Sequence, residues 1–273
     1  MGIKDPKVNP LAAFRPLVLN IYKEALGPFP RSGRCLATDA QLGVDGLPQS
    51  ATGQTSLLTG VNAPLLLGHH LPGFPSPTLR KIIEEKSIFK RLKKADRTVT
   101  FANSFTPEFF SKRPRWVSVT TVMCETAGIK LWKLDDLLAG RSLFMDFTNR
   151  TLKNRGYEVP VRTPQQAASI LLRLSSQYHL CFYEYFLTDL VGHRGNFCEA
   201  VELLTELDQF LFELVKNANL NHTSIVITSD HGNIEQMDQK QHTSNLVPTM
   251  LWGPIGNQVG ATEQEFSLIE IAP

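Results

Sequence analysis

The segment Ser224-Ile225-Val226-Ile227-Thr228-Ser229-Asp230-His231-Gly232-Asn233 indicates the fold class of this chain. Its apolar half is typical of a buried parallel strand, because strands that are covered on both faces have continuous apolar runs. Asp230 and His231 follow directly, at the carboxyl end of that strand. Open α/β sheets build their binding sites at this edge. We therefore predict an α/β protein with Asp230 and His231 in a functional site.

A second apolar run, residues 180–187, also leads to an Asp and a His. Asp189 and His193 are four residues apart in the sequence, so a helical turn would place both on one face. His242 follows further along the chain. Each pair alone is more often part of a polar loop. Together with Asp230 and His231, however, these residues supply the oxygen and nitrogen donors of a two-metal site.

A third segment, residues 47–60, places Ser50 after a turn marked by Pro48 and before an expected helix over residues 51–59. We predict Ser50 at the N-cap of that helix. The positive end of the helix macrodipole favours a bound phosphate as well as a capping hydroxyl. Ser50 is therefore a candidate nucleophile, and an ordinary N-cap is the structural alternative.

Helical and strand patterns alternate along most of the chain. This alternation predicts a doubly wound, mainly parallel sheet with helices on both faces. Further helices are expected over residues 11–26, 88–95, 163–177 and 197–217, and strands over residues 98–102, 180–187, 224–228 and 248–252. We predict a single domain over residues 1–273, within which residues 105–160 interrupt the alternation.

The three segments resemble the alkaline phosphatase superfamily over roughly residues 5–271. The likeness is greatest to the cofactor-independent phosphoglycerate mutase and phosphopentomutase branch and to the shorter bacterial metalloenzyme-domain proteins. In that branch, a Ser or Thr nucleophile follows a Gly-rich turn, as Ser50 does. An Asp-x-x-x-His motif, an Asp-His-Gly motif and a later His hold the metals. The resemblance implies one ion held by Asp189, His193 and His242 and a second held by Asp230, His231 and Ser50.

The resemblance implies a two-metal phosphoryl-transfer enzyme, a phosphohydrolase or phosphomutase, that acts on a small phosphorylated substrate through Ser50. Three imidazoles among the donors favour Mn or Zn over Mg for the two divalent ions. Family members carry cap insertions that select the substrate, and residues 105–160 are expected to form a reduced cap of this kind. Within this segment, Arg141 and Arg150 are candidates for phosphate binding. A surface role is the alternative for both arginines.

The chain departs from the family at its first residues. Family members open with an apolar strand that ends in Asp-Gly, whose Asp ligates the second metal, whereas residues 1–10 resemble the loop after that strand. The Asp-Gly strand is therefore expected to be lacking and activity to be impaired, unless Asp39 or Asp45 supplies the carboxylate. The alternative function is that of a truncated or degenerate metal-binding homologue without catalytic activity.

The composition is that of an ordinary globular protein, with 42% hydrophobic and 20% charged residues. A net charge of +2 gives no reason to expect a nucleic-acid or membrane partner. The sequence shows no signal-peptide core and no apolar run of membrane-spanning length. Its 4 cysteines form no Cys-x-x-Cys pair, as expected in a reducing compartment. We predict a cytoplasmic protein and leave its oligomeric state open.

Overall fold

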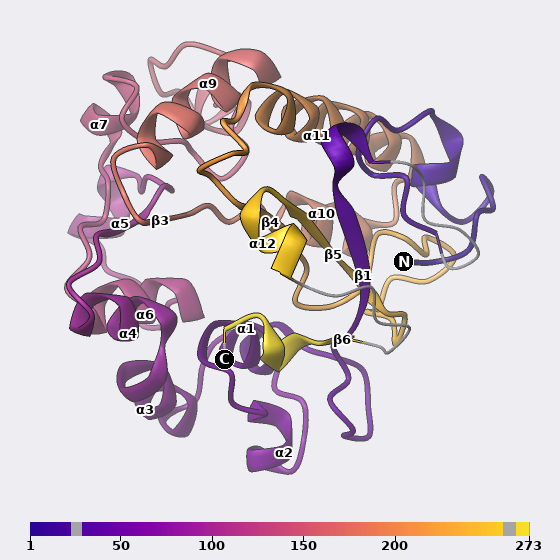
Figure 1. Cartoon of the computed structure of the whole chain (residues 1–273), viewed down its shortest axis with the longest axis horizontal. Helices are drawn as coiled ribbons and strands as arrows, with labels where there is room; N and C mark the ends of the chain where they lie inside the picture. Colours follow the sequence, from indigo (N-terminus) through magenta and orange to yellow (C-terminus); the bar gives the residue numbers. More distant parts are fainter. Residues whose placement is uncertain (23–28, 259–265, 273) are drawn as a thin grey trace.

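The strands form a four-stranded sheet and a two-stranded sheet in the computed structural model, which describes residues 1–22, 29–258 and 266–272 (Figure 1). The four-stranded sheet has the order β4 (Ile225–Thr228), β5 (Val247–Trp252), β1 (Arg34–Asp39) and β6 (Phe266–Ser267). In the smaller sheet, β2 (Val99–Phe101) pairs with β3 (Leu180–Phe182).

The directions of the strands differ from the prediction, although the α/β class is confirmed. Strand β1 pairs in parallel with β6, as β2 does with β3, but β5 is antiparallel to both β1 and β4. The expected mainly parallel sheet is therefore wrong in this respect. The physical reason is the connection between β4 and β5. Residues 229–246 return the chain directly beside β4, as in a long hairpin, without the crossover helix that a parallel neighbour requires.

Helices α9 (Pro164–Ser175) and α11 (Phe197–Asn217) pack together on one face of the larger sheet, at the top of Figure 1. Side chains of α11, such as Phe210 and Leu214, share a core cluster with Met250 and Trp252 of β5. The apolar residues of α11 recur at helical spacing, so burial of this stripe positions the helix.

Helices α1 (Ser50–Thr59), α3 (Pro77–Lys86), α4 (Ile88–Lys94) and α6 (Val119–Thr126) share a second core cluster with both sheets. Val247 of β5 belongs to this cluster, whereas Met250 and Trp252 belong to the cluster of α11. Side chains alternate across a strand, so β5 is covered by helices on both faces. The prediction of helices on both faces is thus confirmed.

The remaining elements are short helices and turns. They are α2 (Ala63–Leu67), α5 (Pro107–Ser111), α7 (Leu134–Leu138), α8 (Arg150–Asn154), α10 (Leu187–Arg194), α12 (Pro254–Gln258), η1 (Pro10–Ala13), η2 (Pro30–Ser32) and η3 (Leu268–Glu270). Within residues 105–160, α6 packs on α1 and α3, so this segment contributes to the core. A cap role for it stays a prediction. None of the helices described has both the length and the apolar character needed to cross a bilayer.

The expected helix over residues 11–26 is not formed in the part that the structure describes, and residues 23–26 lie outside that part. A single 3-10 turn, η1, spans Pro10–Ala13. The backbone N–H groups of Leu17, Val18 and Leu19 donate instead to the carboxylate of Asp208 in α11, over 2.7, 2.9 and 2.7 Å. Pro16 also opposes a helix here, because it lacks an N–H donor.

Asp208 should therefore be a main determinant of how the N-terminal segment docks. The side chain is 2% exposed and accepts three hydrogen bonds. We expect Asp208→Ala to lower the free energy of unfolding by about 3 kcal/mol or more, because each bond to a charged group contributes about 1.5–3 kcal/mol. Asp208→Asn, which keeps one acceptor oxygen, should lose less. Urea denaturation followed by tryptophan fluorescence measures both effects.

Glu202, an exposed acid of the same helix, provides the control. Glu202→Ala should change the free energy of unfolding by no more than about 0.5 kcal/mol. Equal losses in Asp208→Ala and Glu202→Ala would show that the carboxylate of Asp208 does not hold the segment.

Candidate metal site

Ser50 is the first residue of α1, and its hydroxyl makes no capping bond to that helix. The N-cap is Gln49, whose side chain makes no capping bond, so the prediction of Ser50 as N-cap is wrong by one residue. Instead, Ser50 Oγ lies 3.0 Å from His231 Nε2. The hydroxyl therefore contacts a residue of the Asp-His-Gly motif, while the first N–H groups of α1 have no cap from Gln49.

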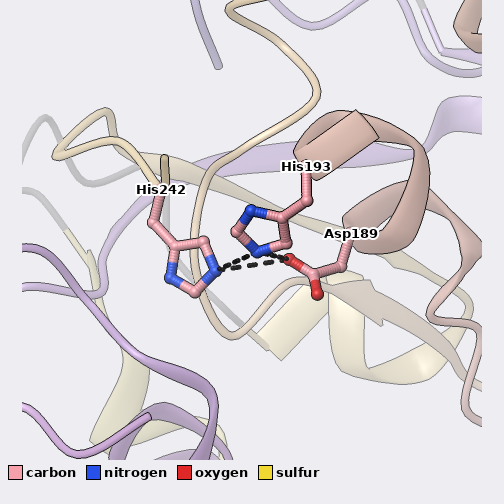
Figure 2. Close-up of side chains that lie close together, drawn as sticks. All are labelled: Asp189, His193 and His242. Carbon is pink, nitrogen blue, oxygen red and sulfur yellow. Dashed lines mark hydrogen bonds and ion pairs between the residues drawn. The ribbon is translucent and has the colours of Figure 1, made fainter. Parts of the chain in front are cut away.

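Asp189 and His193 project from α10, one helical turn apart (Figure 2). His193 Nε2 lies 3.3 Å from Asp189 Oδ1. The expected arrangement on one helix face is thus present, although β3 ends at Phe182 and Asp189 does not follow a strand directly.

The β4–β5 loop, residues 229–246, brings three further residues to α10. His242 Nε2 lies 3.3 Å from Asp189 Oδ1 and 3.1 Å from His193 Nε2. These three donor atoms all lie within 4.8 Å of one another, and Figure 2 shows the side chains converging. Nitrogen and oxygen ligands about 2.0–2.1 Å from a tetrahedral ion stand about 3.3 Å apart. The three separations match that spacing.

Backbone carbonyls orient both imidazoles toward Asp189. His193 Nδ1 lies 2.7 Å from Lys240 O, and His242 Nδ1 lies 2.7 Å from Pro48 O. A carbonyl oxygen only accepts, so each Nδ1 carries the hydrogen. In the neutral ring, each Nε2 then presents a lone pair to the point where the side chains meet. Metal-ligating histidines are commonly oriented by such a bond from their other ring nitrogen.

His231 and Asp230 lie next to this group. The His231 ring stacks on that of His242, with centroids 3.7 Å apart and an interplanar angle of 15°. His231 Nε2 lies 3.6 Å from Asp230 Oδ2 and 4.0 Å from Asp189 Oδ1. The structure thus brings all six predicted site residues together, and Ser50, Asp230 and His231 form a second donor group beside the first.

Two carboxylate oxygens of the site need a positive partner. Asp189 Oδ1 and Asp230 Oδ2 are buried and have no hydrogen-bond donor among the residues that the structure describes. A buried acceptor without a partner is costly, and a buried charge more so. Because the neighbouring Nε2 atoms are acceptors in neutral imidazoles, the donor set fits divalent metal ions.

The ionisation of two site residues reflects the same charge pattern. Burial opposes ionisation of Asp189, but the imidazoles of His242, His231 and His193 outweigh it and lower the pKa of this carboxyl. Burial likewise opposes protonation of His242, but Asp189 and the Pro48 carbonyl outweigh it and raise the pKa of His242. Both shifts have the same cause, the attraction between the Asp189 carboxylate and the protonated form of the neighbouring imidazoles.

Helix α10 and the β4–β5 loop are in close contact at Gly192. A Cβ on Gly192 would overlap Asn233 Oδ1 and lie 2.6 Å from Asn233 Cγ. The Asn233 carboxamide therefore occupies the space that a side chain at position 192 would fill. Only glycine lets the loop approach α10 this closely, between the two donors Asp189 and His193.

A cavity of about 410 Å³ opens onto the donors. Its lining residues are Leu47, Gln49, Ser50, Pro72, Gly73, Asp189, His193, Lys240, Gln241 and His242. This volume is in the range of small-molecule sites. The cavity therefore gives a ligand access to the Ser50 hydroxyl and to the first donor group together.

The two arginines predicted as candidates for phosphate binding form salt bridges with acidic residues. Arg141 Nη2 binds Asp136 at 2.9 Å, and Arg150 Nη1 binds Glu206 at 2.7 Å. Asp39, considered as a substitute ligand, accepts the N–H groups of Gln41 and Leu42 in a turn.

Sequence reasoning missed Asn233 and the orienting carbonyls of Pro48 and Lys240. Backbone acceptors leave no signal in residue type.

Comparisons with known proteins agree with this arrangement. A family model described as the metalloenzyme superfamily matches residues 155–273, which contain all the predicted Asp and His donors. Similar curated proteins include 2,3-bisphosphoglycerate-independent phosphoglycerate mutases of Legionella pneumophila (strain Corby), 33% identical over 118 residues, and Mycoplasmoides gallisepticum, 34% identical over 109 residues. The alignments cover 40% and 38% of this chain, and 22% and 21% of the mutases. The chain thus spans about a fifth of the length of these relatives.

A solved structure shows the same fold. The alkaline phosphatase of the Antarctic bacterium TAB5 aligns with a TM-score of 0.50 and 12% sequence identity, over 92% of this chain and 90% of that one. Together with the family model and the mutase matches, this shared fold supports the predicted resemblance to the alkaline phosphatase superfamily of metalloenzymes.

Proposed function

We propose that this chain is a metal-dependent phosphoryl-transfer enzyme with Ser50 as its nucleophile, either a phosphohydrolase or a phosphomutase of a small phosphorylated substrate. The observation that supports this most is the position of Ser50 Oγ, 3.0 Å from His231 Nε2. The hydroxyl lines the same cavity as Asp189, His193 and His242. The related mutases and the shared alkaline phosphatase fold support the same class of reaction.

Two groups of donors would hold divalent ions. Asp189, His193 and His242 would hold the first, and Asp230, His231 and Ser50 the second. Mixed imidazole and carboxylate donors suit Mn or Zn. Bound ions would polarise the phosphoryl oxygens and favour the alkoxide of Ser50.

The chain's own residues would position the substrate. The start of α1 directs N–H groups and the positive end of its dipole at the place where a phosphoryl group reaches Ser50. Ser50 Oγ would form a bond to phosphorus as the bond to the leaving-group oxygen breaks, which gives a phosphoserine. Water then releases phosphate in a hydrolase, whereas a second substrate hydroxyl accepts the phosphoryl group in a mutase.

Metal binding provides the first test. For protein freed of metal with a chelator, we expect tight binding of Zn²⁺ or Mn²⁺ by isothermal titration calorimetry. Asp189→Asn and His242→Ala should each weaken binding more than about 100-fold, because loss of an outer-shell partner alone costs about 10–100-fold.

His222 is an exposed histidine outside the site and serves as the control. His222→Ala should bind metal like the wild type. Wild-type affinity in Asp189→Asn would remove this residue from the ligand set.

Ser50→Ala tests the nucleophile. Turnover of p-nitrophenyl phosphate should fall by more than about 1,000-fold, because removal of a nucleophile abolishes the covalent route. The free energy of unfolding should fall by only about 1 kcal/mol, the value of one hydrogen bond.

Thr52→Val is the matched variant, because the Thr52 hydroxyl bonds to Gln49 O in the same helical turn. It should lose stability and keep turnover. Near-normal turnover in Ser50→Ala would contradict the assignment. Metal binding without turnover in the wild type would favour the alternative, a metal-binding homologue without catalytic activity.

A further inference from the structure

Glu235 is a buried acid that the proposed chemistry does not use. It lies in the β4–β5 loop between His231 and His242, and 7% of its surface is exposed. A buried carboxylate requires several donors to offset its desolvation. The identity of these donors indicates what the residue does.

The carboxylate joins the two branches of the loop. On the branch that leaves His231, Glu235 Oε2 accepts the N–H of Asn233 over 2.6 Å. On the branch that leads from His242, Glu235 Oε1 accepts Asn245 Nδ2 over 3.1 Å and the Thr243 hydroxyl. One side chain therefore connects segments that supply donors to both proposed metal groups.

The two branches also pair directly at this point. Gly232 and Thr243 form an antiparallel bridge, in which Thr243 N donates to Gly232 O over 3.0 Å. A Cβ on Gly232 would overlap Thr243 Oγ1 and lie 2.5 Å from Glu235 Oε1. The glycine thus leaves room for the carboxylate beside the bridge. Gly232 follows His231 in sequence and Thr243 follows His242, so the bridge fixes the two histidines side by side.

The connection extends to α10. The N–H of Asn233 is held by Glu235, and the Asn233 carboxamide lies against Gly192, between Asp189 and His193. Glu235 thus contacts the backbone of a residue that sets the distance between the loop and α10. The contacts of Glu235 with Asn233, Thr243 and Asn245 therefore connect the two donors of α10 with the two histidines of the loop.

We propose that Glu235 is a positioning residue, which holds the β4–β5 loop in the register that stacks His231 on His242 and brings both against Asp189. Glu235 is not among the residues that line the cavity. Its consequence for metal binding rests on the proposed function. Its consequence for the two histidine rings does not.

Three variants separate these consequences. Glu235→Ala removes every contact of the carboxylate. Glu235→Gln keeps the length of the side chain and one acceptor oxygen, and its amide can donate to the Thr243 hydroxyl. Gln236→Ala is the control, because Gln236 is the next residue of the loop. Of the three groups that donate to Glu235, only the Asn245 side chain also donates to Gln236, over 3.2 Å.

The first measurement uses metal-free protein. In NMR spectra of the wild type, we expect nuclear Overhauser effects between the imidazole rings of His231 and His242, whose centroids are 3.7 Å apart. Glu235→Ala should lose them while circular dichroism shows a folded protein. Glu235→Gln should keep them in part, and Gln236→Ala fully.

The second measurement is Zn²⁺ titration of the same proteins by calorimetry. Glu235→Ala should bind about 10–100-fold more weakly, as for loss of other outer-shell partners. Glu235→Gln should be intermediate, and Gln236→Ala should match the wild type. A wild type that binds no Zn²⁺ but shows the expected ring contacts would overturn the proposed function and leave the positioning role in place.

A folded Glu235→Ala protein with wild-type ring contacts and Zn²⁺ affinity would overturn the positioning role. If Glu235→Ala does not fold, Thr243→Val replaces it, because this variant removes the hydrogen bond from the Thr243 hydroxyl to Glu235. Thr243→Val must then show weaker ring contacts and weaker Zn²⁺ binding, each to a smaller extent than is expected for Glu235→Ala. Wild-type values for a folded Thr243→Val would then overturn the proposal.

Discussion

Mutual repulsion among converging acceptors is the constraint on which this site depends. Asp189 Oδ1, His193 Nε2 and His242 Nε2 meet within 3.1–3.3 Å, and carbonyl bonds at both Nδ1 atoms leave the two Nε2 atoms without hydrogen in the neutral rings. Such an arrangement favours a cation among the acceptors. The raised pKa of His242, caused by Asp189 and the Pro48 carbonyl against the effect of burial, expresses the same demand through a proton.

Three segments of the fold supply the groups of this site. The start of α1 supplies Ser50 and the Pro48 carbonyl, α10 supplies Asp189 and His193, and the β4–β5 loop supplies the remaining donors. Because β5 returns antiparallel to β4, the loop leaves and re-enters the same edge of the sheet. Its two ends therefore place His231 and His242 side by side. A crossover connection to a parallel strand would instead place the two histidines at opposite ends of the sheet.

Elements with local signals were predictable from sequence. The helices expected over residues 163–177 and 88–95 are present, with a capping box of Thr163 and Gln166 at the start of α9 and Ser87 as the cap of α4. Other elements depend on distant partners. Strand β1 contains charged residues at both ends and is stabilised by pairing with β5, so its sequence alone gives no strand signal. Over the described residues 11–22, the non-helical path of the chain is held by Asp208, which is 190 residues away from Val18.

The same division applies to the site. Asp and His residues at motif spacing could be recognised, and the structure brings all of them together with Ser50. The predicted strand over residues 180–187 was too long, because the N–H of Glu184 bonds to the Asn103 side chain over 2.9 Å and α10 begins at Leu187. The groups that orient the donors could not be predicted. They are backbone carbonyls and a loop carboxylate, whose roles depend on tertiary contacts.

The most direct test of the central claim is anomalous X-ray diffraction at the zinc edge from crystals of the protein grown with Zn²⁺. We expect an ion bound by Asp189 Oδ1, His193 Nε2 and His242 Nε2, and a second ion beside Ser50, Asp230 and His231. Anomalous peaks only at other residues, with these side chains unchanged and free of metal, would contradict it.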